Sequence, residues 1–248
     1  MKKWVLVALV ALAVIGFATV HFLEKDPNSL WHIVHDGCMR EQQLHGRPTP
    51  CAAVNLAEGW AVFKDDTHKT QVLLVPTKRV TGIEDPQIVA ADAPNYWKAA
   101  WDARIYVEQR ARRKLQHDEV ALAINSKEAR TQNQLHIHVD CIRSDVHDQL
   151  GIAQAHINNL WSDITVNGQA YRVRTLSPEV LRAENVFTLV LKQLSPGQEM
   201  DQETVLVAGI ILPGNKESFD VLVGRYGIGG NNGSGEDLED HNCAIAKK

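Results

Sequence analysis

The sequence of 248 residues lacks a surplus of positive charge, because 26 Lys and Arg stand against 30 Asp and Glu, a formal net charge of −4. This balance excludes the electrostatic footprint of a general nucleic-acid-binding protein. The chain has no Cys-x-x-Cys pair, so neither a redox dithiol nor a structural zinc site is expected. Its glycine-rich tract at 227–240 lacks the Lys-Ser/Thr ending of a P-loop and is interpreted as a flexible loop. With 44% hydrophobic and 23% charged residues, the composition indicates a folded globular protein.

An apolar run is present near the N-terminus. Residues Trp4 to Leu23, 20 in all, carry no formal charge and follow Lys2 and Lys3. A helix of this length spans roughly 30 Å, the hydrocarbon thickness of a bilayer, and the two lysines hold its start in the cytoplasm. A cleaved signal peptide is the alternative, although the run is long for one and no clear Ala-x-Ala site follows. We therefore expect an anchor and linker at residues 1–27 and one globular domain at 28–248, outside the cytoplasm.

The four cysteines indicate the same compartment. An even number in an exported domain suggests two disulfides, and four cysteines allow three pairings. Cys38 with Cys51 would close a short loop and is the favoured local bridge, in which case Cys141 pairs with Cys243. Four buried thiols are the alternative.

Hydrophobic periodicity predicts an α+β fold with an antiparallel sheet and flanking helices. A helix is expected at 94–115, with Trp97, Trp101 and Ile105 on one core-facing side, and a second helix at 146–160. The expected strands lie at 59–63, 71–75, 119–124, 135–142, 186–191, 204–212 and 219–224, with a hairpin over 164–173 that turns at Asn167-Gly168.

The strand at 135–142 carries the most chemical information. Because side chains alternate along a strand, His136, His138 and Asp140 share one face, and Ile137, Val139 and Cys141 share the other. Two imidazoles and a carboxylate are costly to bury without partners. Three amide side chains suited to phosphate oxygens come just before the strand: Gln132, Asn133 and Gln134.

Three interpretations of this face are open. Hydrogen bonds within the core could satisfy both histidines. Metal binding is the second, because His-x-His-x-Asp resembles the opening of the metallo-β-lactamase motif. Cys141 replaces its last histidine, however, and no second cluster in the expected order is evident, although His147 and His156 follow. The favoured interpretation is nucleophilic catalysis, because a neutral imidazole can attack an α-phosphate and give a nucleotidyl-histidine that water then hydrolyses. Neighbouring imidazole and amide groups would stabilise the developing charge.

The segment resembles the signature of the histidine-triad superfamily, a His-φ-His-φ-His strand with Asn or Gln eleven residues earlier and Gln four residues earlier. Asn125 and Gln132 occupy those two positions relative to His136. The resemblance implies that the middle histidine, His138, is the nucleophile, and that the backbone carbonyl of His136 holds its ring. It also implies phosphate and leaving-group contacts at Asn125 and Asn133.

Two positions depart from that signature. The third triad position is Asp140, and the additional histidine of the superfamily, five residues before the proline at position 76, corresponds to Gln71. These changes leave open which group protonates the leaving oxygen. A phosphomonoester needs that proton less than an amine does.

The whole chain resembles a narrower family, the bacterial CDP-diacylglycerol pyrophosphatases. The resemblance rests on the N-terminal apolar run, WHIVHDGC at 31–38, TPCAAV at 49–54, QNQLHIHVDC at 132–141 and a cysteine near the C-terminus. It implies hydrolysis of CDP-diacylglycerol to CMP and phosphatidate by a single-pass protein of the bacterial inner membrane, with its catalytic domain in the periplasm. The alternatives are a histidine-triad enzyme for soluble nucleotides and an envelope domain that binds nucleotides without turnover.

The sequence therefore predicts a site without metal or other cofactor, a protein that contacts membrane lipids through its anchor, and no nucleic-acid or protein partner. The predicted catalytic residues are His138, His136 and Asp140. The predicted substrate contacts are Asn125, Gln132, Asn133, Gln134, Lys78 and Arg79. The predicted disulfide residues are Cys38, Cys51, Cys141 and Cys243.

Overall fold

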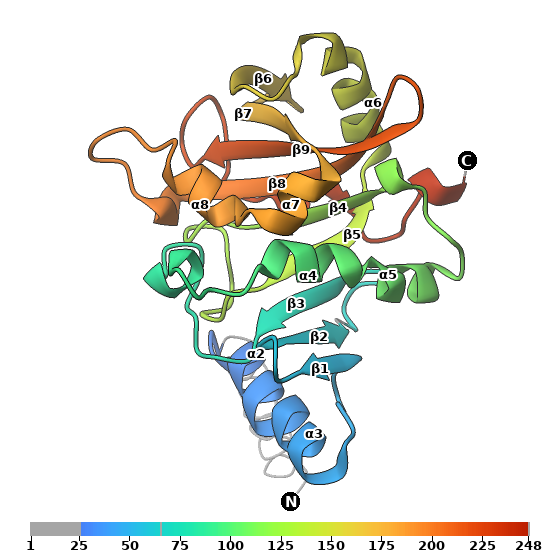
Figure 1. Ribbon diagram of the computed structural model, residues 1–248, viewed down its shortest axis with the longest axis vertical. Helices are drawn as coiled ribbons and strands as arrows, with labels where there is room; N and C mark the ends of the chain where they lie inside the picture. The colour runs from blue at the N-terminus through green and yellow to red at the C-terminus, as the bar shows by residue number, and fades with distance from the viewer. Residues whose placement is uncertain (1–25, 65, 248) are drawn as a thin grey trace, which may run out of the picture.

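A single antiparallel sheet organises the structure, a computed structural model that describes residues 26–64 and 66–247. Nine of its ten strands follow the order β1-β2-β3-β5-β4-β8-β9-β7-β6, and the tenth, β10, pairs with β5 beside this path. Figure 1 shows the strands stacked along the long axis, with β1 near the N-terminal end and β6 near the opposite end. The α+β class with an antiparallel sheet and flanking helices is confirmed.

The strands are β1 Ala53–Asn55, β2 Trp60–Lys64, β3 Val72–Pro76, β4 Val120–Ile124, β5 Ile137–Ile142, β6 Ser162–Val166, β7 Gln169–Leu176, β8 Glu203–Leu212, β9 Lys216–Arg225 and β10 Glu239–Asp240. The α-helices are α2 Ser29–His32, α3 Arg40–His45, α4 Tyr96–Asp102, α5 Arg104–Ala111, α6 Ser144–Ala153, α7 Pro178–Ala183 and α8 Val186–Leu191. A π-helical segment, Ile33–Met39, joins α2 to α3.

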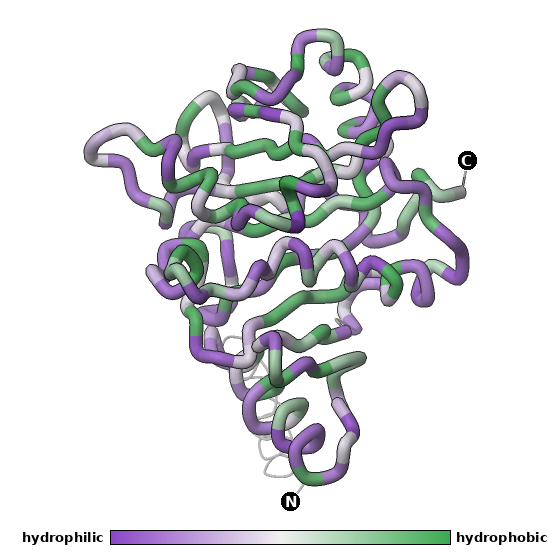
Figure 2. The backbone as a smooth tube through the Cα atoms, in the orientation of Figure 1, coloured by the Kyte–Doolittle hydropathy of each residue, from purple (hydrophilic) through white to green (hydrophobic). Residues whose placement is uncertain are grey.

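Helices α4, α5, α7 and α8 lie over one face of the sheet (Figure 1). Trp97 and Trp101 of α4 are buried in the large core with Ile137 and Val139 of β5, as expected. Burying such side chains is the main stabilising contribution to this layer. Figure 2 shows the apolar residues concentrated along the central strands.

Three expected elements differ from the structure. The helix expected at 94–115 is two helices that break at Ala103, which leaves Ile105 44% exposed instead of in the core. The segment at 186–191 is helix α8 and not a strand, and the side chain of Asn185 caps its start by accepting a hydrogen bond from the Phe187 amide at 3.0 Å. The helix expected at 146–160 begins at Ser144 and ends at Ala153.

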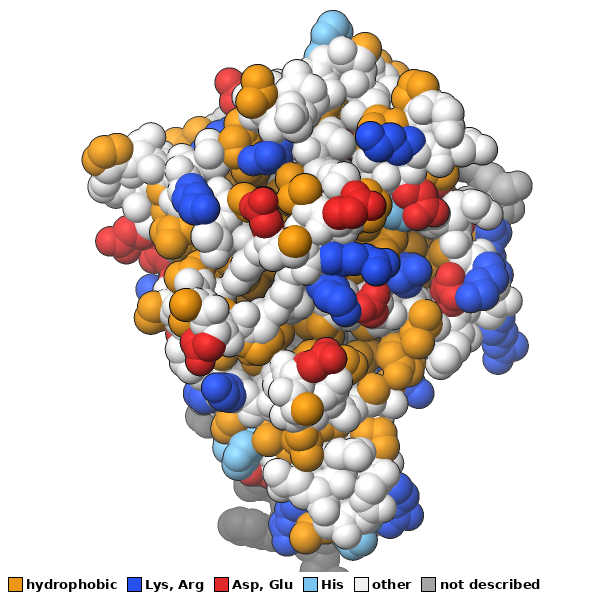
Figure 3. Space-filling model, viewed as in Figure 1, with side chains coloured by type: hydrophobic (Ala, Val, Ile, Leu, Met, Phe, Trp, Pro, Cys, Tyr) orange, Lys and Arg blue, Asp and Glu red, His pale blue; other side chains and the backbone are white. Residues whose placement is uncertain are grey.

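Charges on the helix-covered face are largely paired. Figure 3 shows Lys and Arg side chains gathered near its centre with acidic side chains beside them. Lys98 contacts Asp102 at 2.8 Å, and Lys114 contacts Glu108 at 2.9 Å. Exposed pairs of this kind stabilise a fold only slightly.

The opposite face carries a smaller core near the N-terminal end. Leu30 and Val34 pack there against Leu73 and Val75 of β3. The disulfide Cys38–Cys51 joins this helical segment to the chain just before β1, with a Cα–Cα distance of 5.5 Å. The smaller core covers part of the sheet face on which the histidines lie.

Both disulfides form as favoured, since Cys141 pairs with Cys243 at a Cα–Cα distance of 5.1 Å. No cysteine is free among residues 26–64 and 66–247. The anchor expected at Trp4 to Leu23 lies outside the described residues. Within the part of the chain that the structure describes, no helix has both the length and the apolar character needed to cross a bilayer.

Candidate active site

The histidine strand, β5, lies near the middle of the sheet, and its polar side chains all point to the same face. His138 stands opposite Leu73 of β3 and Ala123 of β4. Ile137 and Val139 enter the core beneath α4, so the predicted alternation is confirmed. The polar residues are well shielded, because His136 is 8% exposed, His138 5% and Asp140 0%.

The imidazole of His138 lies against a carboxylate that comes from the glycine-rich tract. Its Nδ1 is 3.3 Å from Oε1 of Glu236. A carboxylate that faces Nδ1 favours the proton on that nitrogen, so Nε2 is the unprotonated nitrogen of the neutral ring. The contact between the ring and the carbonyl of His136, which the superfamily resemblance implies, stays a prediction. His136 itself lies edge-to-face against His138, with ring centroids 4.9 Å apart, and its Nδ1 is 2.7 Å from the Gln134 carbonyl oxygen.

Two amides hold Glu236 in place. The Asn125 side chain donates to Oε2 at 3.2 Å and accepts a hydrogen bond from the Glu236 amide at 3.2 Å, and Gln71 donates to Oε1 at 3.2 Å. Burial alone would raise the pKa of Glu236, but the charge of His138 and these two amides bring it below its usual value. The carboxylate is therefore ionised at neutral pH.

Asp140 lies beside a third imidazole, that of His241. The carboxylate accepts hydrogen bonds from the Thr70 hydroxyl at 2.7 Å and the Cys141 amide at 2.8 Å, and His241 Nδ1 donates to it at 2.9 Å. These donors stabilise the charged form against the burial that raises the pKa of Asp140.

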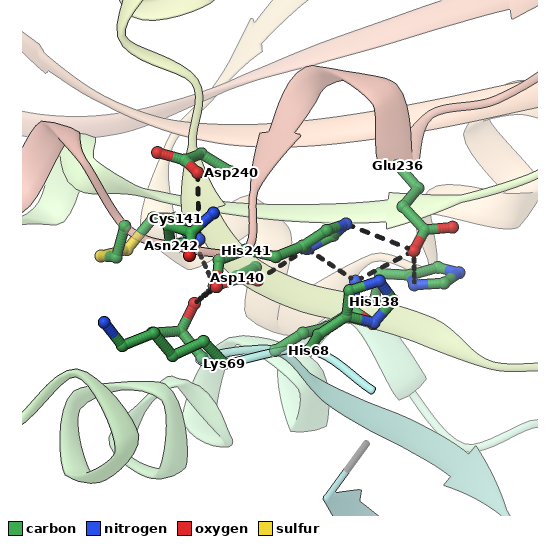
Figure 4. A network of polar contacts seen from close by, with 12 residues as sticks. His68, Lys69, His138, Asp140, Cys141, Glu236, Asp240, His241 and Asn242 are labelled. Carbon is green, nitrogen blue, oxygen red and sulfur yellow. Dashed lines mark hydrogen bonds and ion pairs between the residues drawn. A yellow bond between two sulfur atoms is a disulfide. The ribbon is translucent and has the colours of Figure 1, made fainter. Parts of the chain in front are cut away.

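The other ring nitrogen of His241, Nε2, is 3.5 Å from Oε1 of Glu236. In Figure 4 the His241 ring lies between Asp140 and Glu236, on the side of the cluster next to His138. Burial alone would lower the pKa of His241, but the hydrogen bond and charge of Asp140, with the charges of Glu236 and Asp240, raise it above its usual value.

The C-terminal tract reaches the site because β10 pairs with the end of β5. Asp240 stands opposite Cys141, and the amide of Thr70, just before β3, donates to the carbonyl of His241 at 3.2 Å. The disulfide between Cys141 and Cys243 closes the same junction. Strand pairing and a disulfide therefore both hold the segment around His241 against the end of β5 that follows Asp140.

The glycine-rich tract is bound to the sheet and is not the free loop expected from its composition. Gly233 adopts a φ of +80°, and a Cβ atom there would lie 2.2 Å from Ser126 Oγ. This close approach lets the Gly233 carbonyl accept a hydrogen bond from the Ser126 amide at 2.8 Å. Glycine thus brings the tract against the end of β4 and aims Glu236 at His138.

Two of the other predicted contacts have their amides bonded within the protein. The buried Gln134 side chain donates to the carbonyls of Pro76 and Lys78 at 3.1 and 2.9 Å, which fixes the loop after β3. The side-chain oxygen of Gln132, Oε1, accepts hydrogen bonds from the Ser29 hydroxyl and the Leu30 amide, both at 3.0 Å. As placed, both residues support the fold around the site, and their contact with phosphate stays a prediction.

Three more predicted contacts lie near the surface. Asn133 is exposed, with its side-chain oxygen 3.4 Å from the Arg130 guanidinium. Lys78 is exposed, whereas the Arg79 guanidinium stacks over Trp31 at 5.4 Å and bonds to Asn28. Their binding of phosphate also stays a prediction.

One group of side chains has the spacing of a metal site. Ligand atoms of His68, Glu236 and His241 lie within 4.8 Å of one another. The residues of the metallo-β-lactamase alternative do not assemble, because Cys141 is in a disulfide and His147 Nε2 contacts Asp118 at 3.2 Å. A large cavity of about 980 Å³ between α6 and the β8–β9 hairpin includes none of the histidines of the site.

Sequence reasoning missed Glu236 and His241. A usable signal existed for His241, which precedes Cys243 by two residues. The favoured disulfide would place that histidine next to Asp140, the neighbour of Cys141. Glu236 gave no comparable signal, because its tract was interpreted as free.

The fold and the cluster define an α+β protein with a buried group of imidazoles and carboxylates on one face of its antiparallel sheet. Residues 25–247 match the family model described as CDP-diacylglycerol pyrophosphatase. The chain belongs to the CDP-diacylglycerol pyrophosphatase family, hydrolases of phospholipid metabolism, which confirms the resemblance drawn from its motifs.

Curated relatives match over nearly their whole length. The chain is 31% identical over 249 residues to the CDP-diacylglycerol pyrophosphatase of Yersinia pestis, covering 98% of this chain and 95% of that protein. It is 32% identical over 263 residues to a probable CDP-diacylglycerol pyrophosphatase of Mycobacterium leprae, covering 100% and 96%. A solved structure of a DUF4931 family protein from Bacillus cereus covers 80% of this chain and 100% of that one, with 12% identity and a TM-score of 0.47.

Proposed function

We propose that this protein hydrolyses CDP-diacylglycerol to CMP and phosphatidate through a nucleotidyl-histidine intermediate on His138. The observation that carries the mechanism is the 3.3 Å contact between His138 Nδ1 and Glu236. A carboxylate at Nδ1 sets the tautomer and direction of the ring, and it offsets the positive charge that the imidazole gains when Nε2 bonds to phosphorus.

The reaction has two displacements. In the first, His138 Nε2 attacks the phosphorus next to cytidine, and the bond to the bridging oxygen breaks to release phosphatidate. In the second, water attacks the same phosphorus, the P–N bond breaks, and CMP leaves while His138 returns to its neutral form. The step needs no metal, because imidazole is already a competent nucleophile near neutral pH.

A membrane position for the enzyme suits this substrate. The two disulfides favour an oxidising compartment such as the periplasm. The first described residues are held next to the histidine strand, because Gln132 donates to the Asp26 carbonyl at 3.3 Å and the Asn133 amide donates to the Pro27 carbonyl. If an inner-membrane anchor ended at this point, the membrane surface would lie beside the site. A lipid substrate could then enter the site directly from the bilayer.

The test uses the purified full chain on CDP-diacylglycerol in detergent, with and without EDTA, and quantifies CMP and phosphatidate. Wild type should release both with EDTA present, and His138→Ala should lose activity by about 10³-fold or more. The exposed His45→Ala serves as the matched control and should keep wild-type activity. Loss of wild-type activity in EDTA would contradict the metal-independent mechanism and assign a cation to the cluster of His68, Glu236 and His241. Full activity of a folded His138→Ala would contradict the nucleophile assignment.

A further inference from the structure

We propose that His241 is the catalytic acid of this site, donating a proton to the oxygen of the leaving phosphatidate. The inference rests on the proposed function, because it assigns a further role within the same reaction. None of the motifs predicts the residue, which comes from the C-terminal segment and enters the site through β10.

The first argument is position. His241 Nε2 and His138 Nδ1 face the same oxygen, Oε1 of Glu236, at 3.5 and 3.3 Å. The two rings therefore flank one carboxylate oxygen, which places His241 beside His138. The His241 side chain is 25% exposed, so the ring is open to a ligand, whereas the His138 side chain is only 7% exposed.

The second argument is the partner on the far side of the ring. His241 Nδ1 donates to Asp140, a fully buried carboxylate that also accepts hydrogen bonds from Thr70 and Cys141. A carboxylate at Nδ1 holds the ring in one orientation and favours a proton on each nitrogen. The 3.5 Å separation between Nε2 and Glu236 is long for a hydrogen bond, so this N–H can turn to a substrate oxygen.

The third argument is fixation. The disulfide Cys141–Cys243 and the pairing of β10 with β5 hold the segment against the histidine strand. His68 packs against the His241 ring, with centroids 4.0 Å apart. A catalytic acid has to be held within a fraction of an ångström of its productive position, and these contacts supply that.

The proton balance closes over the two steps. When His138 Nε2 bonds to phosphorus, the bond to the bridging oxygen breaks and that oxygen takes the Nε2 proton of His241. His241 is then neutral, and its remaining proton, on Nδ1, stays hydrogen-bonded to the Asp140 carboxylate. When water attacks the nucleotidyl-histidine, His241 Nε2 takes a proton from that water and returns to its starting form, which makes it the base of the second step.

The test measures how the reaction depends on the leaving group. CDP-diacylglycerol is the reference substrate, and aryl esters of CMP with phenols of increasing basicity are the probes. His241→Gln should lower kcat on CDP-diacylglycerol by about 10-fold and on the most basic phenol by at least about 100-fold, because only basic leaving groups need a proton. The ester of the most acidic phenol should lose least. Asp140→Asn should reproduce the same trend with smaller losses, through its hold on His241.

Controls separate this idea from the proposed function. Failure of wild type to release CMP from CDP-diacylglycerol, or activity of His138→Ala, would contradict the proposed function itself. An active wild type together with a His241→Gln loss that is equal for every leaving group, or absent, would overturn the role of His241 alone. If thermal denaturation shows that His241→Gln is not folded, the dependence of kcat on leaving-group basicity in Asp140→Asn decides the question. The exposed His45→Gln is the matched control and should leave that dependence unchanged. Failure of the wild type to accept any aryl ester would also count against a proton-assisted site.

Discussion

Asp140 and His241, 101 residues apart in the chain, share a partly buried hydrogen bond of 2.9 Å. Through this contact the strand that carries the sequence motif and the C-terminal segment form one site. The motif alone supplies two imidazoles and a carboxylate. A third imidazole, and the carboxylate that faces His138, come from residues 236–241.

Glu236 should matter to the rate more than to substrate binding. Glu236→Gln keeps the size of the side chain but loses the charge that faces Nδ1 of His138. We expect kcat on CDP-diacylglycerol to fall by about 100-fold with KM changed only a few-fold, since the carboxylate acts on the charged intermediate. Steady-state kinetics check this, with the exposed Glu128→Gln as control. An equal loss in the control, or a change confined to KM, would contradict the orienting role.

The two disulfides should have different effects on activity. The double variant Cys141→Ser, Cys243→Ser removes the tether next to Asp140 and His241, whereas Cys38→Ser, Cys51→Ser acts on the N-terminal segment. With sequence separations of 102 and 13 residues, the loop-closure model gives losses of about 5 and about 3 kcal/mol. We expect the first variant to lose kcat at temperatures where it is still folded, and the second to keep it.

Denaturant unfolding and activity, measured on both variants at low temperature, test that difference. Equal kcat values in the two folded variants would show that the C-terminal tether is not needed to place the site.

Asp220 should make the fold less stable as pH rises. It is fully buried in β9, where Thr175 donates to it at 2.7 Å, and burial raises its pKa from 3.8 to about 6. Because the folded state holds this proton more tightly than the unfolded state, the stabilisation is present below pH 4 and is lost as pH rises through 6. The loss is about 3 kcal/mol by the pKa difference.

Asp220→Asn keeps the hydrogen bond from Thr175 and cannot ionise. We expect the variant to match wild type near pH 4 and to exceed its free energy of unfolding by up to about 3 kcal/mol at pH 8. Urea titrations at the two pH values measure this. A variant that is less stable than wild type at pH 8 would contradict the assignment of a raised pKa to this carboxyl.

The sequence predicted the central strands of the sheet better than the helices that pack on them. Alternation at 135–142 gave the correct faces, because one side of β5 lies in an apolar core and the other does not. Periodicity failed at 186–191, where five of the six residues are apolar and four are buried, since such a segment shows neither a helical nor a strand pattern. The capping side chain of Asn185 was the missed signal.

Only part of the candidate site could be predicted from the sequence, and the reason is physical. His138 and its neighbours form a local pattern, whereas Glu236 and His241 reach them only through β10 and a disulfide. Long-range pairing of this kind is set by tertiary packing. Gln132 and Gln134 show the reverse, because amides near the motif bond to the backbone at residues 30, 76 and 78. Nearness in sequence did not distinguish supporting residues from those that face His138.

The nucleotidyl-histidine on His138 can be observed directly. Wild type and His138→Ala would be mixed with excess CDP-diacylglycerol, quenched in denaturant at alkaline pH and digested, and the peptides with residues 135–142 and His241 analysed by mass spectrometry. We predict a cytidylyl adduct on His138 in wild type that is absent from His138→Ala. Turnover with no adduct at any quench time, or an adduct on His136 or His241 instead, would contradict the mechanism.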